Sequence, residues 1–263
     1  MKITVFTGNQ PRHLSLIRDL ASIADEVYAV MEVTTLFPGK REDFFKKSDV
    51  MQEYFSHVME SEKSIFGTIS LLPNNVRPFI MKTGDLNDVS MDILAPALQS
   101  DHYVVFGASY IKGDLIDFLV QHRAYNIHMG ISPYYRGSSC NFWAAYDGNI
   151  DLVGATIHLL SKGLDSGDMF FHALPKVTEN PFDLGMRAVQ SAHKGLMTYL
   201  KEGRLKKMTP IPQDPRLEIR YTRNSDFTDD VARDYLNKLP SQAAIRAAVS
   251  GAVLSKFLNP FVY

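Results

Sequence analysis

Residues 2–31, KITVFTGNQPRHLSLIRDLASIADEVYAVM, contain the pattern that decides the fold. A short β-rich run, Lys2–Thr7, stops at Gly8-Asn9-Gln10-Pro11, and apolar residues then recur at helical spacing over residues 12–24. Glu26–Met31 has the composition of a second strand. A strand, a helix and a strand in this order predict a parallel, right-handed βαβ unit. The full GxGxxG sequence is absent, so a dinucleotide-binding fingerprint is not supported.

Predicted strands and helices continue to alternate along the chain. Further strands are expected at 78–82, 103–106, 124–128, 155–160 and 169–174. Helices are expected at 43–66, 91–98, 114–121 and 180–200, with a loop at 36–40. The strands at 155–160 and 169–174 flank a glycine-containing loop and form a hairpin-like pair. The pattern predicts an α/β fold with a mostly parallel, twisted sheet flanked by helices.

The C-terminal part differs in composition from what precedes it. Residues 203–216 are basic and rich in proline, which predicts an extended connector. Helices are expected at 226–239 and 241–249. We therefore predict a catalytic domain over residues 1–202 and a small helical C-terminal extension over residues 203–263.

Bulk properties limit the classes of function. The chain has 263 residues, a net charge of -1 and a sequence pI of about 6.7, which does not favour a nucleic-acid partner. Cys140 is the only cysteine, so no intramolecular disulfide can form, and we expect a buried thiol rather than a nucleophile. No apolar run approaches the ~20 residues of a membrane helix, and the N-terminus lacks a signal-peptide pattern. We expect a cytoplasmic protein with no membrane partner.

Residues 126–168, NIHMGISPYYRGSSCNFWAAYDGNIDLVGATIHLLSKGLDSGD, carry the candidate chemistry. Asn126 and His128 are two apart in a predicted strand and project to one face. An amide can donate to a developing oxyanion, and an imidazole can move a proton near neutral pH. Asp165, if close, would orient the imidazole and favour its protonated state. Each residue alone also fits a structural role, and spacing does not show that the three converge.

The motifs in this region resemble those of the formyltetrahydrofolate-dependent formyltransferases. The resemblance rests on Asn126-Ile127-His128, Ser132-Pro133, Tyr135-Arg136-Gly137, Ala144, Gly148, 154–158 and 163–168. It is dense over residues 100–200 and faint before them. It implies a Rossmann-like formyltransferase fold and catalytic roles for Asn126, His128 and Asp165.

The resemblance also implies formyltetrahydrofolate as co-substrate. The histidines outside the motif show no ligand spacing such as His-x-x-x-His, so we expect no metal. The family's pterin loop corresponds to Phe106–Ile111 here, with Phe106, Ser109, Tyr110, Ile111 and Gly163 as the expected contacts. One departure is visible, because the family usually has Asn-x-His-x-Ser and this chain has Gly130 at the serine position. We expect this glycine to loosen the turn without touching the three catalytic residues.

The acceptor is expected to be a nucleotide-linked amino deoxysugar, as in the resembling enzymes that serve surface polysaccharide synthesis. The near-neutral charge argues against a tRNA acceptor, and the first turn lacks the phosphate loop typical of phosphoribosylglycinamide enzymes. Arg12, His13 and Arg136 are the expected substrate contacts, the first two at a helix N-terminus that favours anions. His158 lies on the strand leading to Asp165 and is a further residue of interest. Other small amines, a formyltetrahydrofolate hydrolase, a non-catalytic folate-binding paralogue and a homodimeric assembly stay open.

Overall fold

The computed structural model describes residues 1–33, 44 and 47–263. The loop expected at residues 36–40 lies outside these residues, as does most of the expected start of the following helix.

An eight-stranded sheet forms the centre of the molecule, with strand order β10-β8-β7-β5-β4-β1-β2-β3. The sheet is mostly parallel, and the exceptions are the antiparallel pairs β5–β7 and β7–β8. Its strands are β1 (Lys2–Thr7), β2 (Glu26–Val33), β3 (Val76–Lys82), β4 (His102–Phe106), β5 (Tyr125–His128), β7 (Ala155–Leu159), β8 (Met169–Leu174) and β10 (Phe261–Val262). The predicted sheet and its hairpin-like pair are confirmed.

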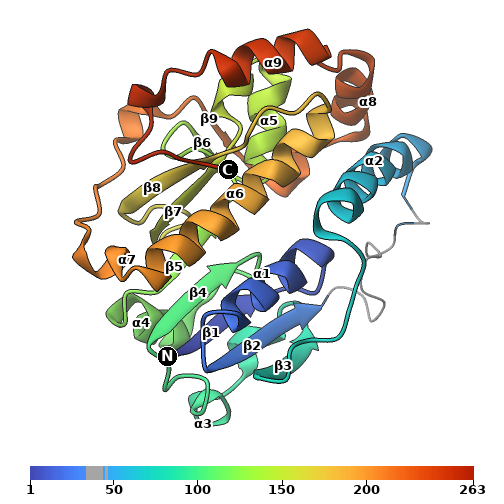
Figure 1. Cartoon of the computed structure of the whole chain (residues 1–263). Coiled ribbons are helices and arrows are strands. Elements are labelled where there is room, and N and C mark those ends of the chain that lie inside the picture. The colour runs from blue at the N-terminus through green and yellow to red at the C-terminus, as the bar shows by residue number, and fades with distance from the viewer. Residues whose placement is uncertain (34–43, 45–46) are drawn as a thin grey trace.

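Helices cover both faces of the sheet (Figure 1). One face packs on α1 (Pro11–Ala21) and α6 (Pro181–Lys201), whose apolar stripes share a core with alternate residues of β1. The other face packs on α3 (Met91–Leu94) and α4 (Gly113–Gln121). This arrangement satisfies the two-faced burial that a parallel sheet needs.

Several predicted elements differ in their bounds from the observed ones, and the helix expected from residue 43 begins only at residue 49. The helix expected to reach residue 98 ends at Leu94, because Pro96 has no N–H to continue the helical hydrogen bonds, although Ala95 keeps helical backbone angles. Within the connector expected to be extended, residues 204–207 form one helical turn, α7 (Arg204–Lys207). α2 (Asp49–Phe66) begins with Ser48 as its N-cap, since the Ser48 side chain accepts from Met51 N.

The chain after β5 adds elements that the sequence did not predict. β6 (Tyr135–Gly137) and β9 (Arg220–Thr222) form a second, two-stranded parallel sheet, and α5 (Cys140–Tyr146) follows β6. The two C-terminal helices are α8 (Asp229–Asn237) and α9 (Gln242–Ser250), as expected. β10 then returns to the edge of the main sheet beside β8. The domain division at residue 202 stays a prediction.

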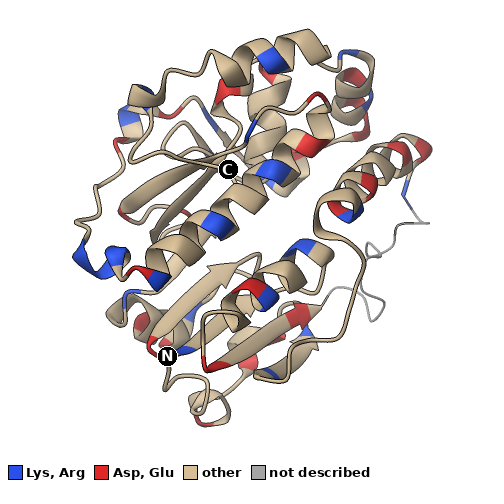
Figure 2. Ribbon diagram, viewed as in Figure 1, with Lys and Arg blue, Asp and Glu red and all other residues tan. Residues whose placement is uncertain are grey.

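Charges of both signs are interspersed along the helices (Figure 2), as the net charge of -1 suggests. Within the described part of the chain, no helix combines the length and apolar character that a bilayer crossing requires.

Candidate active site

β5 carries Asn126 and His128 on one side of the strand. It lies between parallel β4 and antiparallel β7, where the sheet changes from parallel to antiparallel. Oδ1 of Asp165 accepts a hydrogen bond from Nδ2 of Asn126 at 3.1 Å, and Oδ2 lies 3.2 Å from Nδ1 of His128. The structure therefore brings the three predicted residues together around one carboxylate.

The loop between β7 and β8 turns the Asp165 side chain inward. Asp165 has a left-handed backbone, with φ 46°. Gly167 lies directly against the backbone of β7. A Cβ at residue 167 would lie 1.8 Å from the carbonyl oxygen of Leu159, so only glycine fits there. Only 14% of the Asp165 side chain and 6% of the His128 side chain are exposed. The contact between them is thus largely shielded from water.

Burial and charge act in opposite directions on this pair. Burial lowers the pKa of His128, but the carboxylate of Asp165, together with Cys140, raises that pKa well above its usual value. Burial raises the pKa of Asp165, but the charge of His128 and its hydrogen bond bring that pKa well below its usual range. His128 also places Nε2 3.2 Å from the carbonyl oxygen of Tyr135, an acceptor for a second ring N–H. The attraction between the two groups therefore favours an imidazolium–carboxylate pair.

His158 completes the polar cluster from β7, where it pairs with Asn126 across the strands. Its Nδ1 lies 2.7 Å from the carbonyl oxygen of Leu159, which can only accept a hydrogen bond. Its Nε2 lies 3.0 Å from Nδ2 of Asn126, which can only donate. Both contacts are satisfied by the tautomer with its proton on Nδ1. In this state Asn126 donates to both His158 and Asp165.

A cavity of about 350 Å³ opens beside His128, with Arg12 also on its wall. Its lining residues come from α2 on one side and from α5, α6 and α8 on the other. Aromatic rings make up much of this wall: Tyr54, Phe55, Phe142, Phe182, Phe227 and Tyr235. The cavity can hold a partly apolar group whose polar end reaches His128.

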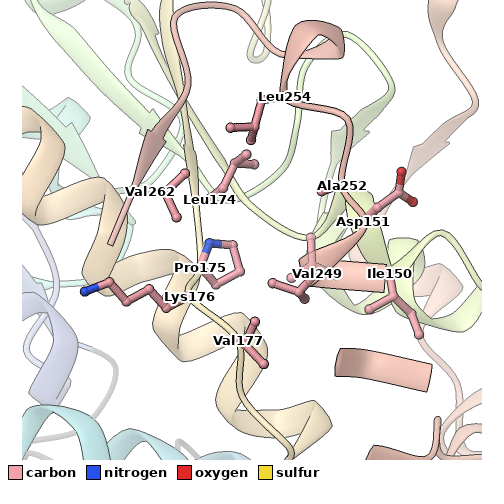
Figure 3. Close-up of a pocket in the computed structure, with 11 residues that line it drawn as sticks. Ile150, Asp151, Leu174, Pro175, Lys176, Val177, Val249, Ala252, Leu254 and Val262 are labelled. Atoms are coloured by element: carbon pink, nitrogen blue, oxygen red, sulfur yellow. The ribbon is translucent and has the colours of Figure 1, made fainter. Parts of the chain in front are cut away.

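A second cavity, of about 190 Å³, lies among the C-terminal elements (Figure 3). Its wall is mainly apolar, with Leu174, Val249 and Val262 on different sides, and Lys176 points away from it. None of the predicted site residues lines it. The cavity at His128 is the candidate substrate pocket, because a predicted catalytic residue lines it.

The predicted substrate contacts occupy three different environments. Arg12 Nη1 pairs with Glu62 Oε1 at 2.6 Å. His13 is buried, with its ring against the backbone at Gly8 and Gly107. The third predicted contact, Arg136, donates to Glu218 and to the carbonyl oxygen of Leu164. The structure thus places Arg12 at the cavity, His13 beneath the first turn and Arg136 against the Asp165 loop.

A family model described as formyl transferase matches residues 1–200. The chain belongs to the formyl transferase family. A methionyl-tRNA formyltransferase of Listeria monocytogenes is 29% identical over 130 residues, which cover 49% of this chain and 41% of that protein. The chain thus matches less than half the length of this curated relative.

Solved structures of other formyltransferases share the fold. A 4-N formyltransferase from Francisella tularensis has a TM-score of 0.52 at 17% identity, covering 86% of this chain and 77% of that chain. An N-formyltransferase from Helicobacter canadensis, in complex with folinic acid and dTDP-3-aminofucose, has a TM-score of 0.53 at 11% identity, covering 87% and 73%. These likenesses confirm the Rossmann-like formyltransferase fold.

Gly130, where this formyl transferase departs from the family motif, is tightly enclosed. A Cβ at residue 130 would lie 2.5 Å from Cβ of Cys140 and 2.7 Å from Nε2 of His128. The expectation that this position touches none of the three predicted catalytic residues is wrong, because it packs directly against His128. Glycine here lets α5 approach the imidazole.

Replacing Gly130 with alanine is expected to destabilise the protein by about 1–3 kcal/mol, because the methyl group overlaps His128 and Cys140. Urea unfolding measures the change. Gly185→Ala is the matched control, since no atom lies within 4 Å of the added carbon in α6, and it should leave stability unchanged or higher. Equal stability of the two variants would contradict the packing described at Gly130.

The loop predicted to contact the formyl donor follows β4. Phe106 and Ile111, at the two ends of this loop, are buried. Tyr110 is 50% exposed, and its hydroxyl donates to the carbonyl oxygen of Lys162. This bond joins the loop to the turn that contains Gly163, where a Cβ would lie 2.3 Å from Ser166 Oγ. The residues predicted to contact the formyl donor thus lie on two loops that meet beside Asp165.

Glu32 is a residue of this region that the sequence analysis missed. It is buried at the end of β2, and its carboxylate accepts from Ser109 N at 2.6 Å and from Gly84 N at 2.7 Å. It therefore fixes the loop after β4 from β2, which is separated from β4 by β1 in the sheet. The available signal was an acidic residue within the apolar strand at 26–33, because a buried carboxylate requires partners.

Proposed function

We propose that this protein transfers the formyl group of formyltetrahydrofolate to the amino group of a nucleotide-linked amino deoxysugar, in surface polysaccharide synthesis. The observation that carries the proposal is the cluster of Asn126, His128 and Asp165, with His128 on the wall of an aromatic cavity. The complex of the Helicobacter canadensis relative with folinic acid and dTDP-3-aminofucose supports this choice of substrates. The near-neutral, interspersed charges argue against a tRNA acceptor, despite the methionyl-tRNA formyltransferases among the relatives.

In the proposed reaction, the sugar amine attacks the formyl carbon and the carbonyl oxygen becomes an oxyanion. The imidazolium of His128 stabilises this charge, and the amide of Asn126 donates to it. Both amide protons of Asn126 are engaged in the structure, so the formyl oxygen must replace one acceptor. The neutral nitrogen of His158 is easier to release than the carboxylate of Asp165, because hydrogen bonds to charged groups are stronger.

The intermediate then collapses by breaking the bond between the formyl carbon and the folate nitrogen. The amine must lose a proton and the folate nitrogen must gain one. We assign this transfer to His128 or to a water held by Asp165. Formyltetrahydrofolate would lie along the loops of Phe106–Ile111 and Gly163, where Ser109, Tyr110 and Ile111 are the proposed contacts.

On the acceptor side, the aromatic rings of the cavity would contact the base or the sugar. Arg12 is the proposed phosphate contact, and a phosphate there would share or displace Glu62. His13 would shape the first turn from below rather than touch the acceptor. Arg136 would hold the edge of the Asp165 loop through its hydrogen bond to the carbonyl oxygen of Leu164.

A panel of nucleotide-linked amino sugars, incubated with the protein and formyltetrahydrofolate, tests the proposal. We expect mass spectrometry to show one formyl group gained on at least one amino sugar, and no gain on the matching sugar without an amine. Free formate released at the same rate with and without the amine would indicate a hydrolase instead. Donor binding by calorimetry without any turnover would indicate a folate-binding protein.

A further inference from the structure

The loop that presents Asp165 is held by a segment from far along the chain. We call residues 211–218 the connector segment. It comprises the last part of the connector and ends just before β9. Ile211 and Met169 exchange two backbone hydrogen bonds of 2.8 Å, which place the connector segment beside the start of β8. A stretch about 45 residues distant in sequence therefore packs against the loop.

The side chain of Gln213 makes the central contact. Its Nε2 donates to the carbonyl oxygen of Asp165 at 2.8 Å and to that of Gly167 at 2.9 Å. Both acceptors are carbonyl oxygens, so only the nitrogen side of the amide fits there. The two contacts span the turn at Asp165 and fix the orientation of the glutamine amide.

A second contact holds the other side of Asp165. Arg136 Nη2 donates to the carbonyl oxygen of Leu164 at 3.1 Å, and its Nη1 bonds to Glu218 of the connector segment at 3.1 Å. The backbone carbonyls of residues 164, 165 and 167 are thus all engaged from outside the loop. Asp165 itself has φ 46°, an uncommon left-handed conformation that aspartate tolerates better than most residues.

We propose that Gln213 is a positioning residue for the reaction, which holds the Asp165 turn so that its carboxylate stays within reach of His128 and Asn126. This inference rests on the role proposed for Asp165. The carboxylate lies 3.2 Å from Nδ1 of His128 and 3.1 Å from Nδ2 of Asn126, and a small rotation of the turn would break both contacts. The residue that holds the turn lies beyond residue 200, where the family match ends.

Gln213→Met tests the proposal, because methionine keeps the length of the side chain and removes both donors. We expect kcat for formyl transfer to fall by about tenfold, the size expected for two neutral hydrogen bonds, with KM for the donor little changed. Arg216→Ala is the matched control on the same segment, since Arg216 is exposed and pairs with Asp214. It should leave kcat unchanged.

The same substitution in an Asp165→Asn background separates positioning from general stability. If Gln213 acts through the Asp165 carboxylate, Gln213→Met should not lower kcat further in that background. Equal losses in both backgrounds, or an unchanged kcat in the single variant, would overturn the proposal. Should Gln213→Met fold poorly, Gln213→Glu serves instead, and its kcat loss should be relieved as the pH falls and the new carboxyl regains a proton to donate.

Nuclear magnetic resonance of the His128 ring gives a readout that needs no substrate. Loss of the Gln213 contacts should lower the pKa of His128, because the carboxylate spends less time beside it. An unchanged His128 titration in Gln213→Met would sink the inference even if the enzyme is active. A wild-type protein that transfers no formyl group would instead refute the proposed function, and the titration would still decide the role of Gln213.

Discussion

His128→Ala is expected to reduce kcat/KM for formyl transfer by about 10³–10⁴, because it removes both the proton carrier and the cation facing the oxyanion. The imidazole is 6% exposed, lies 3.2 Å from the Asp165 carboxylate and lines the candidate substrate cavity. Single-turnover kinetics with a formylated-sugar product measures the loss. Turnover at the wild-type rate would remove His128 from the mechanism.

Stability measurements serve as the control for this variant. His128→Ala leaves a buried carboxylate without its cation, so we expect the free energy of unfolding to fall by about 3 kcal/mol. Adding Asp165→Asn to His128→Ala should recover part of that loss, since no uncompensated charge then remains. Activity should stay low in the double variant, which separates lost chemistry from lost stability.

Asp165→Asn is expected to lower kcat by about 10³–10⁴, the scale found when a carboxylate that orients a catalytic histidine is replaced by its amide. Asparagine keeps the shape of the side chain and tolerates the left-handed backbone at residue 165. The variant should therefore fold and bind the formyl donor. Unchanged kcat in a folded Asp165→Asn protein would show that the reaction does not use the carboxylate.

The pH dependence of this variant follows from the opposing influences on His128. In the wild type, the Asp165 carboxylate raises the pKa of His128 well above 6.5, which favours the protonated ring. Without the carboxylate, burial still lowers the pKa and only Cys140 opposes it, so we expect the pKa of His128 to fall. Titration of the ring resonances measures this, and an unchanged pKa of His128 in Asp165→Asn would contradict the assignment.

The pair also links stability to pH. The raised pKa of His128 contributes stability that is fully present below its unfolded value of 6.5 and is lost as the pH rises through the folded value. The lowered pKa of Asp165 contributes stability that is present above its unfolded value of 3.8 and is lost as the pH falls. The contribution of the pair is therefore largest between these two unfolded values, and Asp165→Asn should flatten the profile there.

The sequence predicted the structure best in the segments whose local pattern defines a strand and which also carry the candidate site residues. Hydrophobic periodicity and composition predict three features that the structure contains. These are the N-terminal βαβ unit, the strand that carries Asn126 and His128, and the hairpin-like pair around Asp165. The family motif added that three residues separated along the chain should meet. The observed distances around the Asp165 carboxylate agree with that expectation.

The parts that could not be predicted depend on contacts between distant segments. β6 and β9 are each three residues long and exist because they pair across some 80 residues. The enclosure of Gly130 by Cys140 and the bond from Gln213 to the Asp165 turn likewise depend on tertiary approach. The placement of His13 shows the same limit, because a helix N-terminus in sequence does not reveal whether a side chain there is buried.

The left-handed backbone at residue 165 limits which substitutions this position accepts. Aspartate and asparagine are among the few non-glycine residues that such a backbone accepts readily, and their codons differ by a single base. One point substitution would thus yield a folded descendant that retains its pocket and lacks turnover. A relative that binds formyltetrahydrofolate and lacks the proposed transfer activity would therefore differ from this protein by a single base.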